Sequence, residues 1–395
     1  MIRSQELETI REDGCDELET SVRGMIFQGD CRVEVGDFDD PVPGTGEAII
    51  EMKASGMCGT DLHYYRDGMK HSLAMLGLAD RAESDRIIGG HEPCGVIAAV
   101  GPDVDRRSFK VGDRVMVFHY AGCNCCDHCR TGWTQLCEQG ARIYGVSSHG
   151  GHADFMKVPV SSLVHLTADV SFKGGAAVAC GTGTAYGALL RLNISARDSL
   201  AVYGLGPVGL STAQLAAAMG VEVFGADINP QRVERSKGFG VAHAIDASRL
   251  DPVDEILKLT GGKGVSCAVE CAGVESARSQ AVRSTQVWGR IALVAVGGNV
   301  TLDVMKDLIG KQRMLLGSFT FSETAMRDCL ALSRITAWKW IGFSPTSGSS
   351  NKRGKPMQTS TIRPVAKASS YSDERGINVS KNNSTEASAA PLHRR

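Results

Sequence analysis

The chain lacks the features that mark membrane and secreted proteins. No run of apolar residues reaches the length of about 18 that a membrane-spanning helix needs. The N-terminal segment MIRSQELETIREDGCDELET is acidic and contains no apolar core of a signal peptide. A formal net charge of -1 gives no global attraction for nucleic acid or an anionic membrane. These absences predict a cytoplasmic protein with neither nucleic acid nor membrane as a partner.

No segment repeats at a fixed period, which excludes solenoid folds. At 395 residues the chain is too long for one ordinary core, and 43% hydrophobic residues suffice for two domains. Short apolar runs such as GEAIIEMKA and VGDRVMVF predict a strand-rich domain in residues 22–165. Strands and helices then alternate through residues 166–333, which predicts a doubly wound parallel sheet. The predicted fold class is therefore α/β.

Thirteen cysteines in a reducing compartment favour metal binding over disulfides. The segment GCNCCDHCRTGWTQLC, residues 122–137, has the spacing C-x2-C-x2-C-x7-C, which lets one loop surround a tetrahedral ion with four thiolates. The predicted ligands of this structural zinc are Cys123, Cys126, Cys129 and Cys137. Cys125 and His128 are then not needed as ligands. Reduced thiols without metal and an iron-sulfur cluster are the alternatives.

A second set of metal ligands is dispersed along the chain. Cys58, His91 and Cys180 offer one nitrogen and two sulfur atoms, and three protein ligands leave the fourth position that a catalytic zinc needs. Asp61 can accept the second ring proton of the ligand histidine, and Glu92 adds another carboxylate beside it. Each residue also has a plain structural explanation, since a buried cysteine is usually a small core side chain.

A nucleotide-binding loop is predicted between two apolar runs, SLAVYGLG and VEVFGAD. Gly204 permits a tight turn, Gly206 lets the backbone approach a pyrophosphate, and Gly209 allows close packing of helix on strand. The helix that follows presents its N-terminus to the phosphates. Asp227 ends the second run, where an acid binds both ribose hydroxyls of NAD and repels the extra phosphate of NADP. Arg232 is either a ribose or phosphate ligand or a solvated helix residue.

CGTDLH, GHEPCG, the four-cysteine loop and GLGPVG, in this order, resemble the zinc-dependent medium-chain dehydrogenases, the alcohol and polyol dehydrogenase superfamily. The resemblance covers roughly residues 22–333. It implies a GroES-like catalytic domain carrying both zinc sites (22–165) and a Rossmann NAD-binding domain (166–333). It also implies two zinc ions per chain and, with an intact C-terminus, a homo-oligomer, dimer or tetramer.

The resemblance assigns roles to residues of this chain. Cys58, His91 and Cys180 match the catalytic zinc ligands, with Glu92 near the metal or as an alternate ligand. Thr60 matches the hydroxyl that takes the substrate proton, and His63 the residue that relays it to solvent. The remaining matches surround the cofactor: Thr184 and Val208 behind the nicotinamide, and Gly204, Gly206, Pro207 and Gly209 in the phosphate loop. Gly59 is a departure, since some relatives have an arginine there that contacts the pyrophosphate.

The resemblance implies hydride transfer between a secondary alcohol or polyol and NAD. Zinc lowers the pKa of the alcohol, and the alkoxide then expels hydride to the nicotinamide. Cys180, where sorbitol dehydrogenases usually have a glutamate, favours the alcohol dehydrogenase pattern. One alternative is a catalytically impaired protein that still binds zinc and nucleotide. A zinc-free quinone reductase is disfavoured because such relatives lack the three ligands.

Both ends of the chain depart from the family. Residues 334–395 are dominated by Ser, Lys, Arg, Asn and Thr, a composition typical of disorder. Codons allowed for Arg334 to Thr361, read one base out of frame, can spell HHGVEMDRFFTHQWKLEQAGEAYANFD, which resembles the segment that completes the catalytic domain in relatives. A frameshift is the preferred explanation, and a genuine regulatory tail is the alternative. Residues 1–21 are expected to be an extension, because the Val22 codon GTG can serve as a bacterial start.

Restoring the frame after Ser333 tests this interpretation. Each large side chain missing from a core costs about 2 to 5 kcal/mol, against a total stability of about 5 to 15 kcal/mol. We therefore expect the 395-residue chain to be poorly soluble or nearly inactive, and the restored version to regain alcohol oxidation and thermal stability. Melting curves and NADH formation by both proteins measure this. Equal performance would show that the tail is a real structural element.

Overall fold

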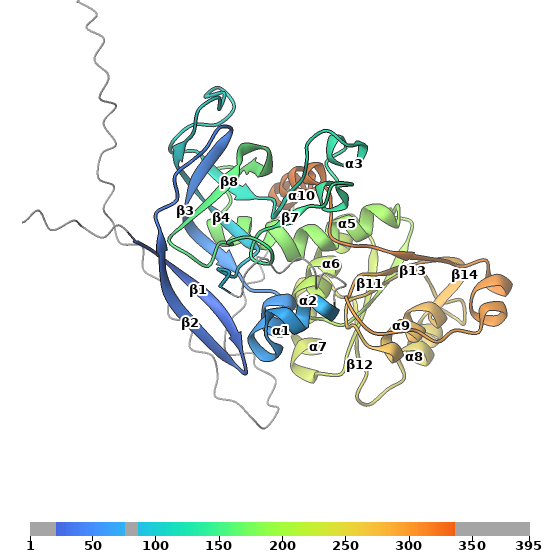
Figure 1. Cartoon of the computed structure of the whole chain (residues 1–395). Helices are drawn as coiled ribbons and strands as arrows, with labels where there is room; N and C mark the ends of the chain where they lie inside the picture. Colours follow the sequence, from blue (N-terminus) through green and yellow to red (C-terminus); the bar gives the residue numbers. More distant parts are fainter. Residues whose placement is uncertain (1–20, 76–85, 336–395) are drawn as a thin grey trace, which may run out of the picture. The chain divides into compact units, whose positions relative to one another are not determined.

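A computed structural model describes residues 21–75 and 86–335 (Figure 1). The predictions of an N-terminal extension and of an altered tail fall largely on residues 1–20 and 336–395, which lie outside the described residues. The first described strand, β1, begins at Ser21, and the last helix, α10, runs to Ile335, two residues into the predicted tail. Within the described ranges, no helix is both long and apolar enough to cross a bilayer.

The N-terminal part is antiparallel. A hairpin joins β1 to β2, and five further strands form a sheet in the order β8-β3-β4-β5-β9. Side chains on one face of this sheet, among them Ile50, Val115 and Val158, are fully buried in one apolar cluster. The strands are β1 (Ser21–Gly29), β2 (Arg32–Asp39), β3 (Glu47–Gly56), β4 (Glu92–Val100), β5 (Arg114–Val117), β8 (Phe155–Pro159) and β9 (Leu163–His165), with a separate pair, β6 (Tyr120–Ala121) and β7 (Arg142–Ile143).

The second sheet is parallel throughout and has the order β12-β11-β10-β13-β14-β15. In chain order this is 3-2-1-4-5-6, the arrangement of dinucleotide-binding folds. The predicted α/β class, with a GroES-like sheet and a doubly wound parallel sheet, is confirmed. The strands are β10 (Ser199–Tyr203), β11 (Glu222–Asp227), β12 (His243–Asp246), β13 (Val265–Glu270), β14 (Thr285–Leu293) and β15 (Met314–Gly317).

Helices cover both faces of the parallel sheet. Successive residues of β10 alternate between two apolar clusters, because neighbouring side chains on a strand point to opposite faces. One cluster contains residues of α5, α6 and α7, and the other contains residues of α8 and α9. The helices are α1 (Gly59–Asp67), α2 (Met69–Met75), α3 (Asp127–Arg130), α4 (Phe172–Ala177), α5 (Gly183–Arg191), α6 (Pro207–Ala218), α7 (Pro230–Ser236), α8 (Pro252–Leu259), α9 (Glu275–Arg283) and α10 (Glu323–Ile335).

The last described helix, α10, is part of the core that also holds catalytic-domain residues. Phe321, just before the helix, is fully buried, and its ring meets that of Phe118 edge to face at 5.6 Å. Its backbone oxygen accepts a hydrogen bond from the Gln135 side chain (2.9 Å). Within the helix, the Cys329 thiol faces the carbonyl of Thr182 at 3.8 Å. After the parallel sheet, the chain therefore returns and adds side chains to the apolar core of the antiparallel part.

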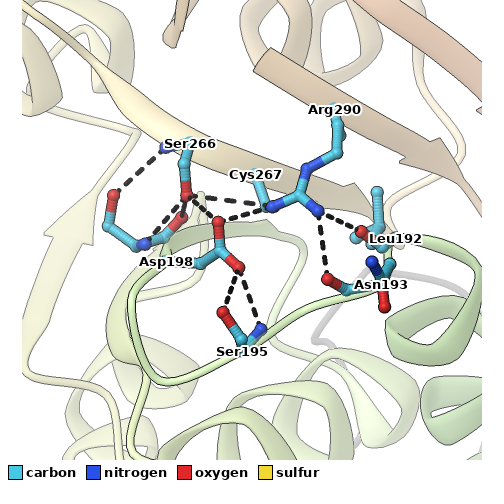
Figure 2. Close-up of polar contacts among 8 residues, drawn as sticks. Leu192, Asn193, Ser195, Asp198, Ser266, Cys267 and Arg290 are labelled. Carbon is cyan, nitrogen blue, oxygen red and sulfur yellow. Dashed lines mark hydrogen bonds and ion pairs between the residues drawn. The ribbon is translucent and has the colours of Figure 1, made fainter. Parts of the chain in front are cut away.

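A polar network connects the middle of β14 to the amino ends of β10 and β13 (Figure 2). Asp198, just before β10, accepts hydrogen bonds from the backbone N–H of Ser195 (2.9 Å) and the hydroxyl of Ser266 on β13 (2.9 Å). Arg290 on β14 pairs with Asp198 and donates to the carbonyls of Leu192 (2.6 Å) and Asn193 (3.0 Å). This network connects the sheet to the loop that follows α5.

Candidate active site

Three segments that are distant in the sequence place Cys58, His91 and Cys180 together. Their ligand atoms all lie within 4.8 Å of one another, and Sγ of Cys58 is 2.8 Å from Nε2 of His91. Cys58 caps the start of α1, His91 precedes β4, and Cys180 lies in a single π-helical turn, η4 (Val178–Thr182). Zinc bonds of about 2.0 to 2.3 Å require ligand atoms this close, so two sulfurs and one imidazole nitrogen fit a zinc ion with one open position.

Asp61 contacts both neighbouring ligand residues. One of its oxygens faces Nδ1 of His91 at 3.4 Å, and the other accepts the backbone N–H of Cys58 at 2.8 Å. Burial alone would lower the pKa of His91, but the negative charges of Asp61 and Cys58 outweigh burial and raise that pKa well above its usual value. Asp61 therefore favours the histidine orientation in which Nε2 points to the sulfur ligand.

The pKa values of the two thiols of this centre shift in opposite directions. A hydrogen bond with Cys180 holds the pKa of Cys58 well below its usual value, and the same bond raises the pKa of Cys180. The backbone N–H of Thr60 also donates to Sγ of Cys58 (3.2 Å), which favours a thiolate there. A thiolate is the form of cysteine that binds metal.

Glu92 is buried beside this centre but is not one of the three mutually close ligand groups. Burial raises the pKa of its carboxyl group well above the usual value, and the charge of Cys58 adds to this effect. A side chain at Gly56 is excluded, because a Cβ atom there would lie 1.9 Å from Oε2 of Glu92. The sequence motif predicts Glu92 near the metal, and in the structure its carboxyl group interacts with the ligand Cys180 and lies against the strand that leads to Cys58.

His119 is a residue of the centre that the sequence analysis missed. Its buried ring lies 5.3 Å from the ring of His91, and its Nδ1 is 3.1 Å from the carbonyl oxygen of Ala179, next to Cys180. Burial lowers the pKa of His119 to about 3, so the ring is neutral at physiological pH. The run VMVFHY has no metal-ligand spacing, and the contact arises only because the residues between β5 and β6 meet η4.

The four cysteines of the short loop also meet. The Sγ atoms of Cys123, Cys126, Cys129 and Cys137 all lie within 4.8 Å of one another. Backbone N–H groups, including that of Cys126 (3.3 Å), bond the sulfur of Cys123 and lower its pKa to about 6. Gly122 gives the loop room, because a Cβ atom there would lie 2.5 Å from Sγ of Cys129. Cys125 and His128 are outside this group, and the four sulfurs fit a closed zinc site.

The two residues assigned to proton relay lie on one helix. Thr60 and His63 are three residues apart on α1, which places them on the same face. His63 is exposed, and its Nδ1 is 3.5 Å from a carboxylate oxygen of Asp67. Thr60 is half-buried, directly beside the sulfur of Cys58. The helix therefore leads from the metal ligand to solvent.

Each glycine of the phosphate loop answers a different constraint. Gly204 has φ +90°, and a Cβ atom there would lie 2.8 Å from the backbone nitrogen of Ala272. A Cβ atom on Gly209 would lie 1.8 Å from the carbonyl oxygen of Gly204. Gly206 faces open space and caps α6, whose first residue is Pro207. The open backbone at the start of this helix can receive a pyrophosphate.

Asp227 lies at the end of β11 beside this loop. Its carboxylate accepts the backbone N–H of Leu205 (2.7 Å) and of Asn229 (2.8 Å). The guanidinium of Arg232 lies 3.6 Å from the same carboxylate. Each carboxylate oxygen has a further lone pair, so Asp227 can still accept ribose hydroxyls. Arg232, for which two roles were open, pairs with Asp227 in this structure.

The nucleotide loop and the metal-ligand turn are in direct contact. Val208 on α6 comes within 4.0 Å of the position that a Cβ atom of Gly181 would occupy, one residue after Cys180. The hydroxyls of Thr182 and Ser211 share a hydrogen bond (3.1 Å). Thr184 follows on α5 and is half-buried. The structure therefore places Val208, one of the two residues assigned to the nicotinamide, beside the turn that holds Cys180.

Comparisons with known proteins agree with this geometry. Residues 44–168 match the family model of the alcohol dehydrogenase GroES-like domain, and residues 207–335 match that of zinc-binding dehydrogenases. An uncharacterized zinc-type alcohol dehydrogenase-like protein of Escherichia coli, YphC, is 36% identical over 314 residues, which are 79% of this chain and 87% of that protein.

Two further relatives have a named substrate. Sorbitol dehydrogenase of Bacillus subtilis is 30% identical over 306 residues, 77% of this chain and 84% of that enzyme. The crystal structure of 2R,3R-butanediol dehydrogenase from Bacillus subtilis superimposes with a TM-score of 0.69 at 27% identity, covering 80% of this chain and 88% of that one.

Metal analysis of cysteine variants tests the two sites. We expect about two zinc ions per chain, one in a closed and one in an open site. Cys58→Ser should lose about one zinc with little change in melting temperature, whereas Cys126→Ser should lose about one zinc and destabilise the fold, because structural zinc contributes folding energy.

Cys125→Ser is the matched control, because Cys125 is exposed and lies outside both groups. It should keep both ions and the wild-type melting temperature. Elemental analysis of the purified proteins gives the zinc content. A loss of zinc from the control variant, or a single zinc in the wild type, would contradict the two-site assignment.

Proposed function

Because the chain belongs to the zinc-containing medium-chain alcohol and polyol dehydrogenase superfamily, we propose that it transfers hydride between a secondary alcohol or polyol and NAD. The observation that carries the proposal is the open three-ligand centre of Cys58, His91 and Cys180 beside the phosphate loop. When bound there, a zinc ion would act as a Lewis acid and polarise the oxygen of the alcohol or carbonyl.

The residues around the centre prepare it for this chemistry. Asp61 orients His91, and the N–H of Thr60 supports the thiolate of Cys58. The hydroxyl of Thr60 takes the substrate proton, and His63, exposed on the same helix, passes it to solvent with Asp67 as its neighbour. Thr184 and Val208 pack behind the nicotinamide and direct its reactive face toward the substrate.

The dinucleotide is held at the carboxyl ends of the parallel strands. Gly206 and the N-terminus of α6 bind the pyrophosphate, and Asp227 binds the ribose hydroxyls. The negative charge of Asp227 favours NAD over NADP, although Arg232 at 3.6 Å offsets part of that charge. The third sulfur ligand, Cys180, supports a simple secondary alcohol more than sorbitol as substrate.

A panel of secondary alcohols and polyols tests the activity. We expect NADH to form with at least one secondary alcohol, and NAD binding measured in parallel separates an active enzyme from an impaired binding protein. Binding without turnover of any member of the panel, in both the 395-residue chain and its frame-restored version, would contradict the proposed reaction.

We further propose that two copies of the chain associate along β15. Among the residues that the structure describes, this strand is the last in the parallel sheet, and an unpaired edge is a template for another strand. Large apolar side chains are exposed on β14, on β15 and on the two helical segments between them, η6 (Val304–Leu308) and η7 (Ile309–Lys311): Val287, Trp288, Val304, Met305, Ile309 and Met314. Exposed apolar side chains beside an edge strand suit a two-fold dimer, in which both copies use the same surface.

Charge substitution tests the dimer. Met305→Glu together with Met314→Glu places two carboxylates on each copy of the exposed apolar surface, so we expect a shift from dimer to monomer in light scattering. Leu250→Glu is the control, because Leu250 is about equally exposed but follows β12 at the other edge of the sheet. An unchanged mass for the double variant would contradict association through β15.

Cofactor choice is tested at Asp227. Asp227→Asn removes the charge but keeps an oxygen for one of the two backbone N–H groups, so the loop should remain folded. We expect the preference for NAD over NADP to fall by about tenfold or more, since a like-charge contact costs several kcal/mol. Dissociation constants for NADH and NADPH measure this preference.

Asp246→Asn is the matched control for this change. Asp246 is the register partner of Asp227 on β12, at the same end of the sheet, but it caps its own turn through Ser248. The control should leave the ratio of the two dissociation constants unchanged. Equal binding of NADH and NADPH by the wild-type chain would rule out the assigned role of Asp227.

A further inference from the structure

A buried ion pair lies at the carboxyl end of the parallel sheet. Glu270 is the last residue of β13, Arg278 lies on α9, and Nε of Arg278 is 3.4 Å from Oε2 of Glu270. The side chains of Glu270 and Arg278 are 0% and 4% exposed. Two fully desolvated charges are costly to bury, so their remaining polar atoms should have partners. Those partners show what the pair holds.

Arg278 binds the segment that follows β14. Its guanidinium donates to the carbonyl oxygens of Ala295 (3.2 Å) and Asn299 (3.1 Å), and also to that of Gly297. The segment bends tightly around the guanidinium. Gly298 has φ +71°, and a Cβ atom there would lie 2.6 Å from Nη1 of Arg278. Residues 295–299 are therefore shaped by one side chain.

Glu270 binds the turn after its own strand. Its Oε1 accepts the backbone N–H groups of Ala272 and Gly273, each at 2.6 Å. Ala272 in turn packs against the phosphate loop, because its backbone nitrogen is only 2.8 Å from where a Cβ atom of Gly204 would stand. A continuous set of contacts thus runs from Gly204 through Ala272, Glu270 and Arg278 to residues 295–299.

These three loops follow β10, β13 and β14, at the edge of the sheet where dinucleotides bind. A comparable arginine–carboxylate network, formed by Arg290 and Asp198, lies toward the amino ends of the same strands (Figure 2). Arg290 likewise pairs with a carboxylate and donates to two carbonyls, but its network lies at the amino ends of β10 and β13. The two networks share their chemistry and differ in place.

We propose that Glu270 and Arg278 are positioning residues for the dinucleotide, holding residues 272–273 and 295–299 in the conformation that receives it. This inference rests on the proposed function, because it requires that NAD binds at this edge. It adds to the phosphate loop a second determinant of cofactor affinity, which acts through the backbone and not by direct contact.

Arg278→Lys and Arg290→Lys form a matched pair of variants for the full chain. Lysine keeps the positive charge but carries its three N–H donors on a single nitrogen, which cannot span the carboxylate and the three carbonyls that the planar guanidinium reaches. Both variants should lower the melting temperature. Only Arg278→Lys should raise the dissociation constant for NADH, by about tenfold, as expected for the loss of a charged hydrogen bond.

A double variant separates positioning from charge compensation. Arg278→Met alone leaves the Glu270 charge buried without a partner, and adding Glu270→Gln removes that charge. We expect the double variant to regain melting temperature relative to Arg278→Met while its dissociation constant for NADH stays high. Recovery of both quantities would show that the pair only compensates charge, and would overturn the proposal.

Hydrogen exchange of the protein without cofactor gives a readout that is independent of binding. In Arg278→Lys, the amides of residues 272–273 and 295–299 should exchange faster, while the amides near Ser195 and Asp198 should not change. Unchanged exchange, or wild-type affinity for NADH in Arg278→Lys, would overturn the inference alone. A wild-type chain that binds neither NADH nor NADPH would instead contradict the proposed function on which the inference rests.

Discussion

The pairing of β3 with β4 constrains the whole centre, because it sets Gly56 opposite Glu92 and so brings Cys58 and His91 together. The Cys58 sulfur then lies 2.8 Å from the His91 imidazole, and both residues lie beside the π-helical turn that holds Cys180. That turn is bonded to α6 through Thr182 and Ser211, so the phosphate loop follows the metal ligands. The metal centre and the phosphate loop are therefore connected through Thr182, two residues after Cys180 in the same turn.

Much of this organisation could be predicted from the sequence because it is encoded locally. The four-cysteine spacing and the glycines of the phosphate loop each occupy one short segment, and the apolar runs of β10, β11, β13 and β14 are read directly. His119 and the pair Glu270–Arg278 could not be found in this way. Their partners belong to other strands or loops, and only the tertiary register brings them within bonding distance.

Arg232 shows the same limit at a single residue. Its place just after the acidic end of β11 was compatible with a cofactor ligand or with a solvated helix residue. The structure shows a third role, an ion pair with Asp227 at 3.6 Å. A basic residue near a predicted cofactor-binding acid is thus not enough to assign a cofactor contact, because the two side chains can pair with each other.

The packing of Phe321 against Phe118 has a consequence for folding during synthesis. The N-terminal sheet is synthesised first, yet part of its apolar core comes from Phe321, Met326 and Cys329, which leave the ribosome more than 150 residues after the last strand of that sheet. Until then, the partly built core is exposed, and closing so long a loop is slow. The nascent catalytic half is therefore expected to need protection by chaperones, whereas the parallel sheet can fold as its strands emerge.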